Sequence, residues 1–370
     1  MGPEKAKNEI NRSGKTGVLM SRWNGPKVLS GKYIKIVRQP IVFIMSKKTL
    51  NKNLHKAKNA KKDEFYTQLS DIEKEMKSYK GHFKGKVVFC NCDDPWVSNF
   101  FRYFSYKFEK LRLKKLITTC YKNQNMDLFS QNKSEKAIYL EYEGDKNANK
   151  VPDPKEIGTK QLKGDGDFRS EECIELLKQA DIVVTNPPFS LFREYVAQLI
   201  KYDKKFVIIG NQNAITYKEI FKLIKENKIW LGHSIHSGDR EFGVPKDYPL
   251  NAASFRVDEY GNKFIRVKGV RWFTNFDYEE RHEDLPLYKN YNKNEFPTYD
   301  NYDAINIDKT KDIPMDYDGI MGVPITFLDK YNPDQFEIVK FRKGNDDKDL
   351  SINGKYPYFR ILIRKKKIKK

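Results

Sequence analysis

The sequence predicts an α/β protein: a doubly wound, mostly parallel sheet with a terminal antiparallel hairpin, followed by a smaller α+β region. Short β-branched and apolar runs alternate with segments that are apolar at helical spacing, a pattern typical of a parallel sheet between two layers of helices. Two further runs, 253–257 and 264–267, flank a polar stretch that contains Gly261 and Asn262. Such a pair indicates a hairpin, and we expect it to close the sheet.

The individual elements follow from capping residues and apolar spacing. Ser70, with Glu73 three residues later, has the capping-box pattern of a helix start. Ser170 is the expected cap of the helix before strand 181–185, and a loop rich in Asp and Gly precedes it. The expected strands are 86–92, 116–121, 137–142, 181–185, 205–210, 229–233, 320–328 and 336–341, and the expected helices are 70–79, 98–108, 190–200 and 217–226.

The positive charge of the chain is concentrated at its two ends. Residues 1–62 contain 16 Lys or Arg and two acids, and residues 360–370 contain seven Lys or Arg, so +14 and +7 of the net +20 leave −1 for residues 63–359. Cationic ends suit a polyanion, which they bind through counterion release; a solvated tail that aids solubility is the alternative. We expect a disordered leader at 1–45 and two domains, 46–277 and 278–370.

Composition argues against a membrane protein and a disulfide-bonded one. No apolar run approaches the ~20 residues of a membrane helix, and none has the form of a signal peptide. The cysteines form neither a normal disulfide pair nor a zinc set. We therefore expect free thiols, a cytoplasmic location and no metal. The four cysteines are Cys90, Cys92, Cys120 and Cys173.

The most informative residues follow strand 181–185 directly: Asn186, Pro187, Pro188 and Phe189. The strand gives way to a helix there, and ligands of open α/β sheets bind outside the carboxyl ends of the strands. The prolines make a stiff turn with free carbonyls, Asn186 adds a side-chain acceptor, and Phe189 adds a flat ring. Two acceptors and a ring suit a heterocycle with an exocyclic amine, polarised to attack a methylsulfonium. A proline-stiffened connection with a core Phe is the alternative.

This tetrapeptide resembles the catalytic motif of amino-methyltransferases, and much of the chain is similar to the EcoRI-type DNA adenine-N6 modification methyltransferases. The resemblance is continuous from about residue 50 to the end. The tetrapeptide alone is also shared with some RNA methyltransferases. The further segments that carry the resemblance are 62–68 (KDEFYTQ), 89–95 (FCNCDDP), 164–170 (GDGDFRS) and 322–328 (GVPITFL).

The resemblance implies a Rossmann-like methyltransferase sheet that binds S-adenosylmethionine, with residues 269–275 as its last strand. It implies that Asn186 and Pro187 hold the target amine and that Phe189 stacks on the base. The chain departs from usual cofactor-binding sheets, because no Gly-x-Gly follows the strand at 86–92 and no acid ends the strand at 116–121. The cofactor-binding residues that it implies are Phe65, Tyr66, Thr67, Asn91, Asp93, Pro95, Asp167 and Phe168.

The resemblance also implies the reaction and its setting. A methyl group would pass from S-adenosylmethionine to N6 of an adenine flipped out of double-stranded DNA, at a short site such as GAATTC. The enzyme would be a cytoplasmic monomer that protects DNA from a cognate restriction endonuclease without binding it. Region 278–370 would recognise the target, and Arg193, His236 and Arg240 are candidate DNA contacts, although a plain surface loop explains the last two equally well.

Two other functions stay open at this point. An RNA base methyltransferase, acting for example on ribosomal RNA, would share the catalytic turn and differ in its substrate. A non-enzymatic DNA-binding protein on an inactive methyltransferase framework is the third reading, and the intact tetrapeptide argues against it.

Overall fold

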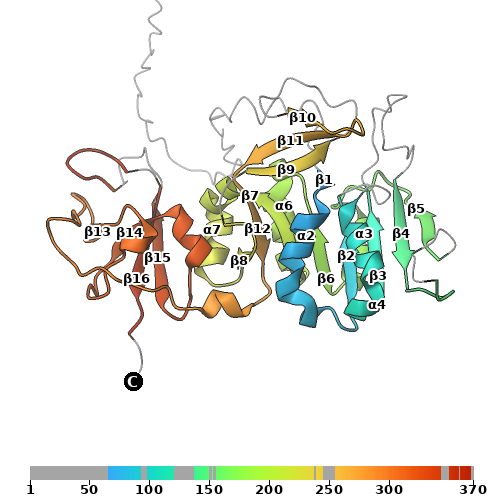
Figure 1. Cartoon of the computed structure of the whole chain (residues 1–370), viewed down its shortest axis with the longest axis horizontal. Coiled ribbons are helices and arrows are strands. Elements are labelled where there is room, and N and C mark those ends of the chain that lie inside the picture. Colours follow the sequence, from blue (N-terminus) through green and yellow to red (C-terminus); the bar gives the residue numbers. More distant parts are fainter. Residues whose placement is uncertain are drawn as a thin grey trace, which may run out of the picture. The chain divides into compact units, whose positions relative to one another are not determined.

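In the residues that it describes, a computed structural model of the chain shows three β-sheets, with helices packed around the largest of them (Figure 1). None of the described helices is long and apolar enough to cross a membrane. The four cysteines are free, as predicted. The predicted leader 1–45 and three predicted site residues, Phe65, Asp93 and Pro95, lie outside the described residues. The structure describes residues 66–92, 98–120, 137–149, 152, 156–236, 239–244, 255–342, 350–357 and 359–367.

The largest sheet contains eight strands: β2 (Val87–Cys90), β3 (Lys115–Thr119), β4 (Ile138–Tyr142), β5 (Gly158–Gln161), β6 (Ile182–Thr185), β7 (Lys205–Asn211), β8 (Trp230–Leu231) and β12 (Val270–Thr274). Their order is β5-β4-β3-β2-β6-β7-β12-β8. The four central strands β3, β2, β6 and β7 pair in parallel, whereas the outer pairs are antiparallel. The sheet is therefore mixed with a parallel centre, and not mostly parallel as the sequence predicts, because strands are added antiparallel on both sides of that centre.

Helices cover both faces of this sheet, because alternate strand residues point to opposite sides. Val88 and Cys90 of β2 join one apolar cluster, whereas Val87 and Phe89 join another. The first cluster includes α2 (Leu69–Met76), η1 (Lys77–His82), α3 (Asn99–Tyr106) and α4 (Phe108–Leu111). The second includes α5 (Glu171–Gln179), α6 (Phe192–Lys201) and α7 (Lys218–Lys225); the short turns η2 (Phe189–Leu191) and η3 (Gln212–Thr216) precede the last two.

Two predicted caps have different outcomes. The hydroxyl of Ser170 accepts from the backbone N–H of Cys173 at 3.3 Å and caps α5, as predicted. The predicted capping box at Ser70 is wrong, because α2 begins at Leu69 and the cap position is Gln68, two residues before Ser70. Gln68 continues the extended backbone of the preceding strand, and its carbonyl accepts from the N–H groups of Asp71 and Ile72. Ser70 therefore lies inside the first helical turn.

The predicted hairpin exists but does not belong to the largest sheet. β10 (Phe255–Val257) and β11 (Lys263–Lys268) pair with each other, and β11 continues to β9 (Asp239–Val244) and β1 (Tyr66–Thr67) in a separate antiparallel sheet. Gly269, with φ of +67°, turns the chain between β11 and β12. Only β12 therefore enters the largest sheet, where it runs antiparallel to β7.

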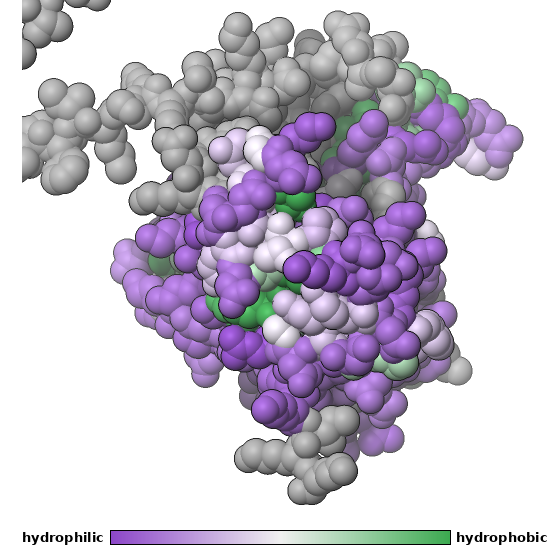
Figure 2. Space-filling view, turned by 90° about the vertical axis from the view of Figure 1, so that its left-hand side faces the viewer, coloured by the Kyte–Doolittle hydropathy of each residue, from purple (hydrophilic) through white to green (hydrophobic). Residues whose placement is uncertain are grey.

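The third sheet lies in the segment after residue 277. It contains β13 (Ile305–Asn306), β14 (Met321–Pro324), β16 (Arg360–Lys365) and β15 (Phe336–Arg342), in that order. The expected α-helical content is wrong for the described part of this segment, whose helices are 3₁₀ turns: η4 (Glu279–His282), η5 (Thr310–Asp312) and η6 (Ile325–Lys330). The expected strand 320–328 ends at Pro324, which has no N–H to extend the ladder. Figure 2 views the molecule from this side, where the surface is mainly hydrophilic.

The third sheet is joined to the largest one by apolar and ionic contacts. The apolar cluster that contains α7 continues through β14 and β15, and the rings of Phe221 and Phe341 lie 4.8 Å apart. Arg271 of β12 donates from Nε to Asp329 Oδ1 of η6 at 3.0 Å, and both side chains are almost fully buried. Removing one partner of such a pair leaves an uncompensated buried charge. The pair therefore fixes η6 against the sheet.

A buried carboxylate fixes the segment that follows β8. Glu75 of α2 accepts from the backbone N–H groups of His233 and Ser234 at 3.0 and 2.7 Å, and from the hydroxyl of Tyr79 at 2.7 Å. Burial raises the pKa of Glu75, against the effect of these donors. Gly232 passes so close that an added Cβ would lie 2.1 Å from Glu75 Oε1 and 2.5 Å from Trp272 Cβ.

This close approach makes Gly232 sensitive to substitution. We expect Gly232→Ala to lower the free energy of unfolding by about 1–3 kcal/mol, because buried neighbours must move to admit one methyl group. Denaturant unfolding measures the effect. Gly81→Ala is the matched control, since nothing lies within 4 Å of its added Cβ, and it should be nearly neutral. Equal effects of the two substitutions would contradict the close approach at Gly232.

Candidate active site

The pairing of β2 with β6 brings two predicted site residues to neighbouring strand ends. The strands are parallel, with Val88 opposite Ile182 and Phe89 opposite Val183. Their carboxyl ends therefore lie side by side, and Asn91 and Asn186 follow them directly. Both asparagines are buried. This edge of a parallel sheet is where open α/β proteins bind ligands.

Asn91 is held by hydrogen bonds from two elements that follow in the chain. The Thr185 hydroxyl donates to its backbone carbonyl, and the Tyr195 hydroxyl of α6 donates to its side-chain Oδ1. All three residues are buried, and burial raises the pKa of Tyr195 well above its usual value. Because Oδ1 accepts from Tyr195, the Nδ2 group is the donor that Asn91 can offer to a ligand.

The loop at 164–170 is fixed against α6 and β3. The rings of Phe168 and Tyr195 meet edge to face with centroids 5.0 Å apart, and Gln198 Nε2 donates to the Phe168 carbonyl at 2.9 Å. Gly166 has φ of +79°, and an added Cβ would lie 2.1 Å from the carbonyl oxygen of Cys120, just after β3. The structure thus places Phe168 at the same edge as Asn91.

Asp167 is ionised and paired within this loop. Its carboxylate accepts from Arg169 Nε and Nη2 at 2.9 and 2.6 Å, and Arg169 Nη1 donates to Glu194 at 2.9 Å. Hydrogen bonding by Arg169 holds the pKa of Asp167 below its usual value. The backbone N–H of Arg169 also donates to Asp167 Oδ1, at 2.8 Å. A carboxylate has about four lone-pair sites, so one remains for a further donor.

Three threonine hydroxyls at this edge are buried without a hydrogen-bond partner among the described residues: Thr67, Thr118 and Thr119. Thr67 lies in β1, and its carbonyl accepts from Asn99 Nδ2 at 2.7 Å, which ties β1 to the start of α3. A buried hydroxyl without a partner costs free energy that a polar ligand can recover. The sequence predicted Thr67 as a site residue but not Thr118 or Thr119. Their signal in the sequence is a pair of threonines at the end of an apolar strand.

The tetrapeptide itself forms the corner between β6 and α6. Asn186 and Pro187 are buried, whereas Pro188 and Phe189 are half-buried. Phe189 opens η2, in which the N–H of Leu191 donates to the Pro188 carbonyl at 3.0 Å. Phe189 packs against the cluster that contains α2 and α3. The chain therefore turns from β6 into η2 at this corner, and the Pro188 carbonyl, which the sequence predicts to be free, is used inside η2.

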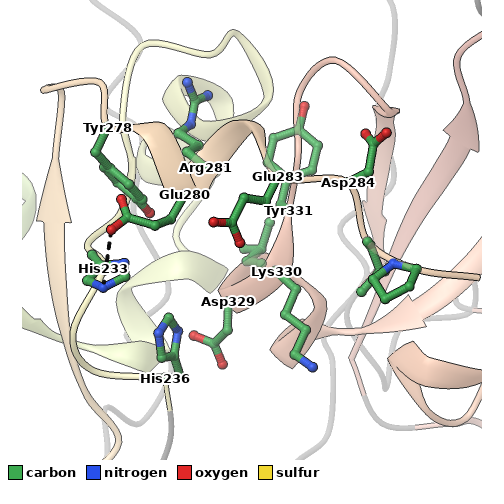
Figure 3. A pocket seen from close by; sticks show the side chains of 13 residues that line it. His233, His236, Tyr278, Glu280, Arg281, Glu283, Asp284, Asp329, Lys330 and Tyr331 are labelled. Carbon is green, nitrogen blue, oxygen red and sulfur yellow. Dashed lines mark ion pairs between the residues drawn. The ribbon is translucent and has the colours of Figure 1, made fainter.

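The three predicted DNA contacts lie on different elements. Arg193 is exposed on α6 with its guanidinium 5.0 Å from the Tyr217 ring. Arg240 of β9 is turned toward α2, with Nε 4.0 Å from Asp71 Oδ1. His236 lines a cavity of about 340 Å³ and faces Asp329 in Figure 3, and burial lowers its pKa. The structure does not bring these three residues together.

The hydrogen bond from Tyr195 to Asn91 predicts a measurable cost of removing one hydroxyl. Tyr195→Phe leaves a buried amide oxygen without its donor, and we expect a loss of about 1–3 kcal/mol in the free energy of unfolding. Thermal and denaturant unfolding measure it. Tyr106→Phe is the control at an exposed tyrosine of the neighbouring helix α3. A Tyr195→Phe protein as stable as this control would show that the hydrogen bond contributes nothing.

Comparison with known proteins identifies relatives along almost the whole chain. The sequence model described as "Adenine-specific methyltransferase EcoRI" matches residues 53–366. The type II methyltransferase M.EcoRI of Escherichia coli is 57% identical over 328 residues, which cover 88% of this chain and 100% of the relative. The type II methyltransferases M.MgeORF184P of Mycoplasma genitalium and M.MpnI of Mycoplasma pneumoniae are 40% and 37% identical, covering 85% and 84% of this chain and 99% and 98% of the relatives. No solved structure matches the chain.

Proposed function

Because the chain belongs to the family of the adenine-specific methyltransferase EcoRI, we propose that the edge formed by β2 and β6 is its methyl-transfer site, with S-adenosylmethionine as the methyl donor. The protein is a site-specific DNA adenine methyltransferase of a restriction-modification system. The observation that carries the assignment of the site is the parallel pairing of β2 and β6, which sets Asn91 beside the corner at Asn186.

The residues at this edge fit a bound S-adenosylmethionine, which supplies an electrophilic methyl group on a sulfonium. The mixed sheet with a parallel centre acts as the Rossmann-like methyltransferase sheet. The buried hydroxyl of Thr67, which has no partner among the described residues, suits the carboxylate of the methionine part, as the sequence resemblance implied. Asn91 offers Nδ2, and Asp167 and Phe168 suit the amino group and the face of the adenine part. Tyr66, Phe65, Asp93 and Pro95 complete the proposed cofactor contacts.

The corner at 186–189 would hold the target amine. Asn186 Oδ1 and the Pro187 carbonyl accept the two amino hydrogens, and the ring of Phe189 stacks on the base. Fixed acceptors draw the nitrogen toward a tetrahedral form whose lone pair can attack. Positioning and preorganised dipoles supply most of the rate. The adenine must leave the duplex to reach a buried corner, so base flipping is part of the proposal.

The rest of the proposal concerns the target and the setting. Residues 278–370 form the target-recognition region, supported by their attachment to the largest sheet through Arg271 and Asp329. The proposed recognition sequence is GAATTC, the short palindrome that the sequence resemblance implies, and the similarity to M.EcoRI covers the whole length of that relative. The protein acts as a monomer in the cytoplasm, and its cognate restriction endonuclease shares the DNA site without forming a complex.

Substrate choice can be tested directly. With tritiated methyl donor, we expect label in N6-methyladenine of a duplex that contains GAATTC, and none in a duplex with the same bases in another order. The two prolines and Asn186 hold any planar amine, so the discrimination must come from DNA contacts. Label in ribosomal RNA but not in duplex DNA would replace the DNA assignment with the RNA one.

Asn186 is the residue whose removal separates transfer from binding. We expect Asn186→Ala to lower kcat by about 10²–10³ or more, because a fixed acceptor for the reacting amine is lost. Binding of S-adenosylmethionine, measured by calorimetry, should stay unchanged. Asn147→Ala, at an exposed position between β4 and β5, is the control and should keep full activity. Full activity of the Asn186→Ala protein would refute the role given to this side chain.

A further inference from the structure

A hollow lined by lysines lies between two pairs of helical elements on one face of the largest sheet. There, α2 and η1 face α3 and α4 across a hollow of about 500 Å³, which we call the lysine groove. One acid and two other polar residues, Glu73, Ser70 and Tyr103, also line it, together with Leu111. Burial, with Glu73 nearby, raises the pKa of Tyr103 to about 12, so this hydroxyl stays a neutral donor. The five lysines of the groove are Lys74, Lys77, Lys80, Lys107 and Lys110.

The charge of this groove is local. Five lysines and one acid give 5 − 1 = +4 in one hollow, whereas residues 63–359 together carry −1. Among the described residues, no carboxylate forms an ion pair with any of the five ammonium groups. Like charges gathered in one place repel one another, so the groove favours an anion with several charges. The groove is therefore unlike an ordinary solvated surface with alternating signs.

The lysine groove begins next to the proposed active site. α2 follows β1, which contains Thr67, and α3 starts at Asn99, which bonds the Thr67 carbonyl. Lys74, Lys77 and Lys80 recur every three residues, first in an α-helix and then in a 3₁₀ helix. From Ser70 to Lys80 the path is roughly 15–20 Å long, at rises of about 1.5 and 2.0 Å per residue. The helix α2, which carries the first of these lysines, leads away from this edge of the sheet (Figure 1).

We propose that the lysine groove binds the phosphate backbone of the substrate DNA on one flank of the target site; this inference rests on the proposed function. A DNA strand carries one charge per ~3.4 Å of axis, and a row of lysines can follow it. Lysine is a flexible point charge without a fixed fork of donors, which suits phosphate contact and not base reading. The groove therefore adds affinity that is independent of the flanking sequence.

The test combines a neutralised groove with salt and duplex length. The variant is Lys77→Gln, Lys80→Gln and Lys110→Gln, at three exposed positions, and the control is Lys222→Gln, Lys225→Gln and Lys228→Gln in and just after α7. DNA affinity is measured against salt for a short duplex limited to the target site and for a long one with flanks. The plot of log affinity against log salt should be shallower for the groove variant on the long duplex, by about 2–3 units of slope at ~0.9 per phosphate contact.

The other readouts separate this inference from the proposed function. The groove variant should keep the affinity for S-adenosylmethionine and kcat at saturating DNA, and should lose the affinity that the flanks add for the unsubstituted protein. Equal slopes for the groove variant and the unsubstituted protein would overturn the assignment. A second result would also overturn it: inorganic phosphate binds the unsubstituted protein and not the groove variant, while the two proteins have the same salt slope for DNA. Failure of the proposed function would appear separately, as absence of methyl transfer by the unsubstituted protein.

Discussion

The hydrogen bonds on Asn91 hold the site together. They come from Thr185 at the end of β6 and from Tyr195 of α6. One residue at the end of β2 thus fixes the relative position of the next strand and the helix that follows it. The corner at 186–189 lies between Thr185 and Tyr195 in the chain, so its position relative to Asn91 depends on the same bonds. The ring of Phe168 meets that of Tyr195 edge to face and connects the loop at 164–170 to these residues.

Much of this arrangement could be predicted from the sequence, because its signals are local. The strand before Asn186, the cap at Ser170 and the helices after both were recognised from apolar spacing and single capping residues. The hairpin at 253–267 was also recognised, but its sheet was wrong, because the turn at Gly269 decides which strand enters which sheet. The cap of α2 was missed since Gln68 takes its conformation from β1, and β1 forms only by pairing with β9, far away in the chain. Thr118 and Thr119 are informative only once the structure shows that their buried hydroxyls have no partner in the described part of the chain.

The charge of the protein is distributed unevenly, both along the sequence and over the folded surface. The sequence shows two cationic ends and a nearly neutral body. The structure shows that the neutral body is not uniform, because acids cluster around the cavity near His236 while lysines gather between α2 and α3. Sequence could not show the lysine groove, since its two sides come from segments some thirty residues apart that meet only after β2 has joined the sheet. The three predicted DNA contacts were chosen by residue type alone, and the structure separates them.

The buried pair of Arg271 and Asp329 has a consequence for engineering. A chimaera made by exchanging everything after residue 277 with a relative would keep the arginine on one parent and take the aspartate from the other. The same junction cuts through the packing of Phe221 on Phe341. The boundary at residue 277 therefore does not separate two regions that can be exchanged independently. A chimaera with a new DNA specificity would need β12 and α7 from the same parent as the segment after residue 277.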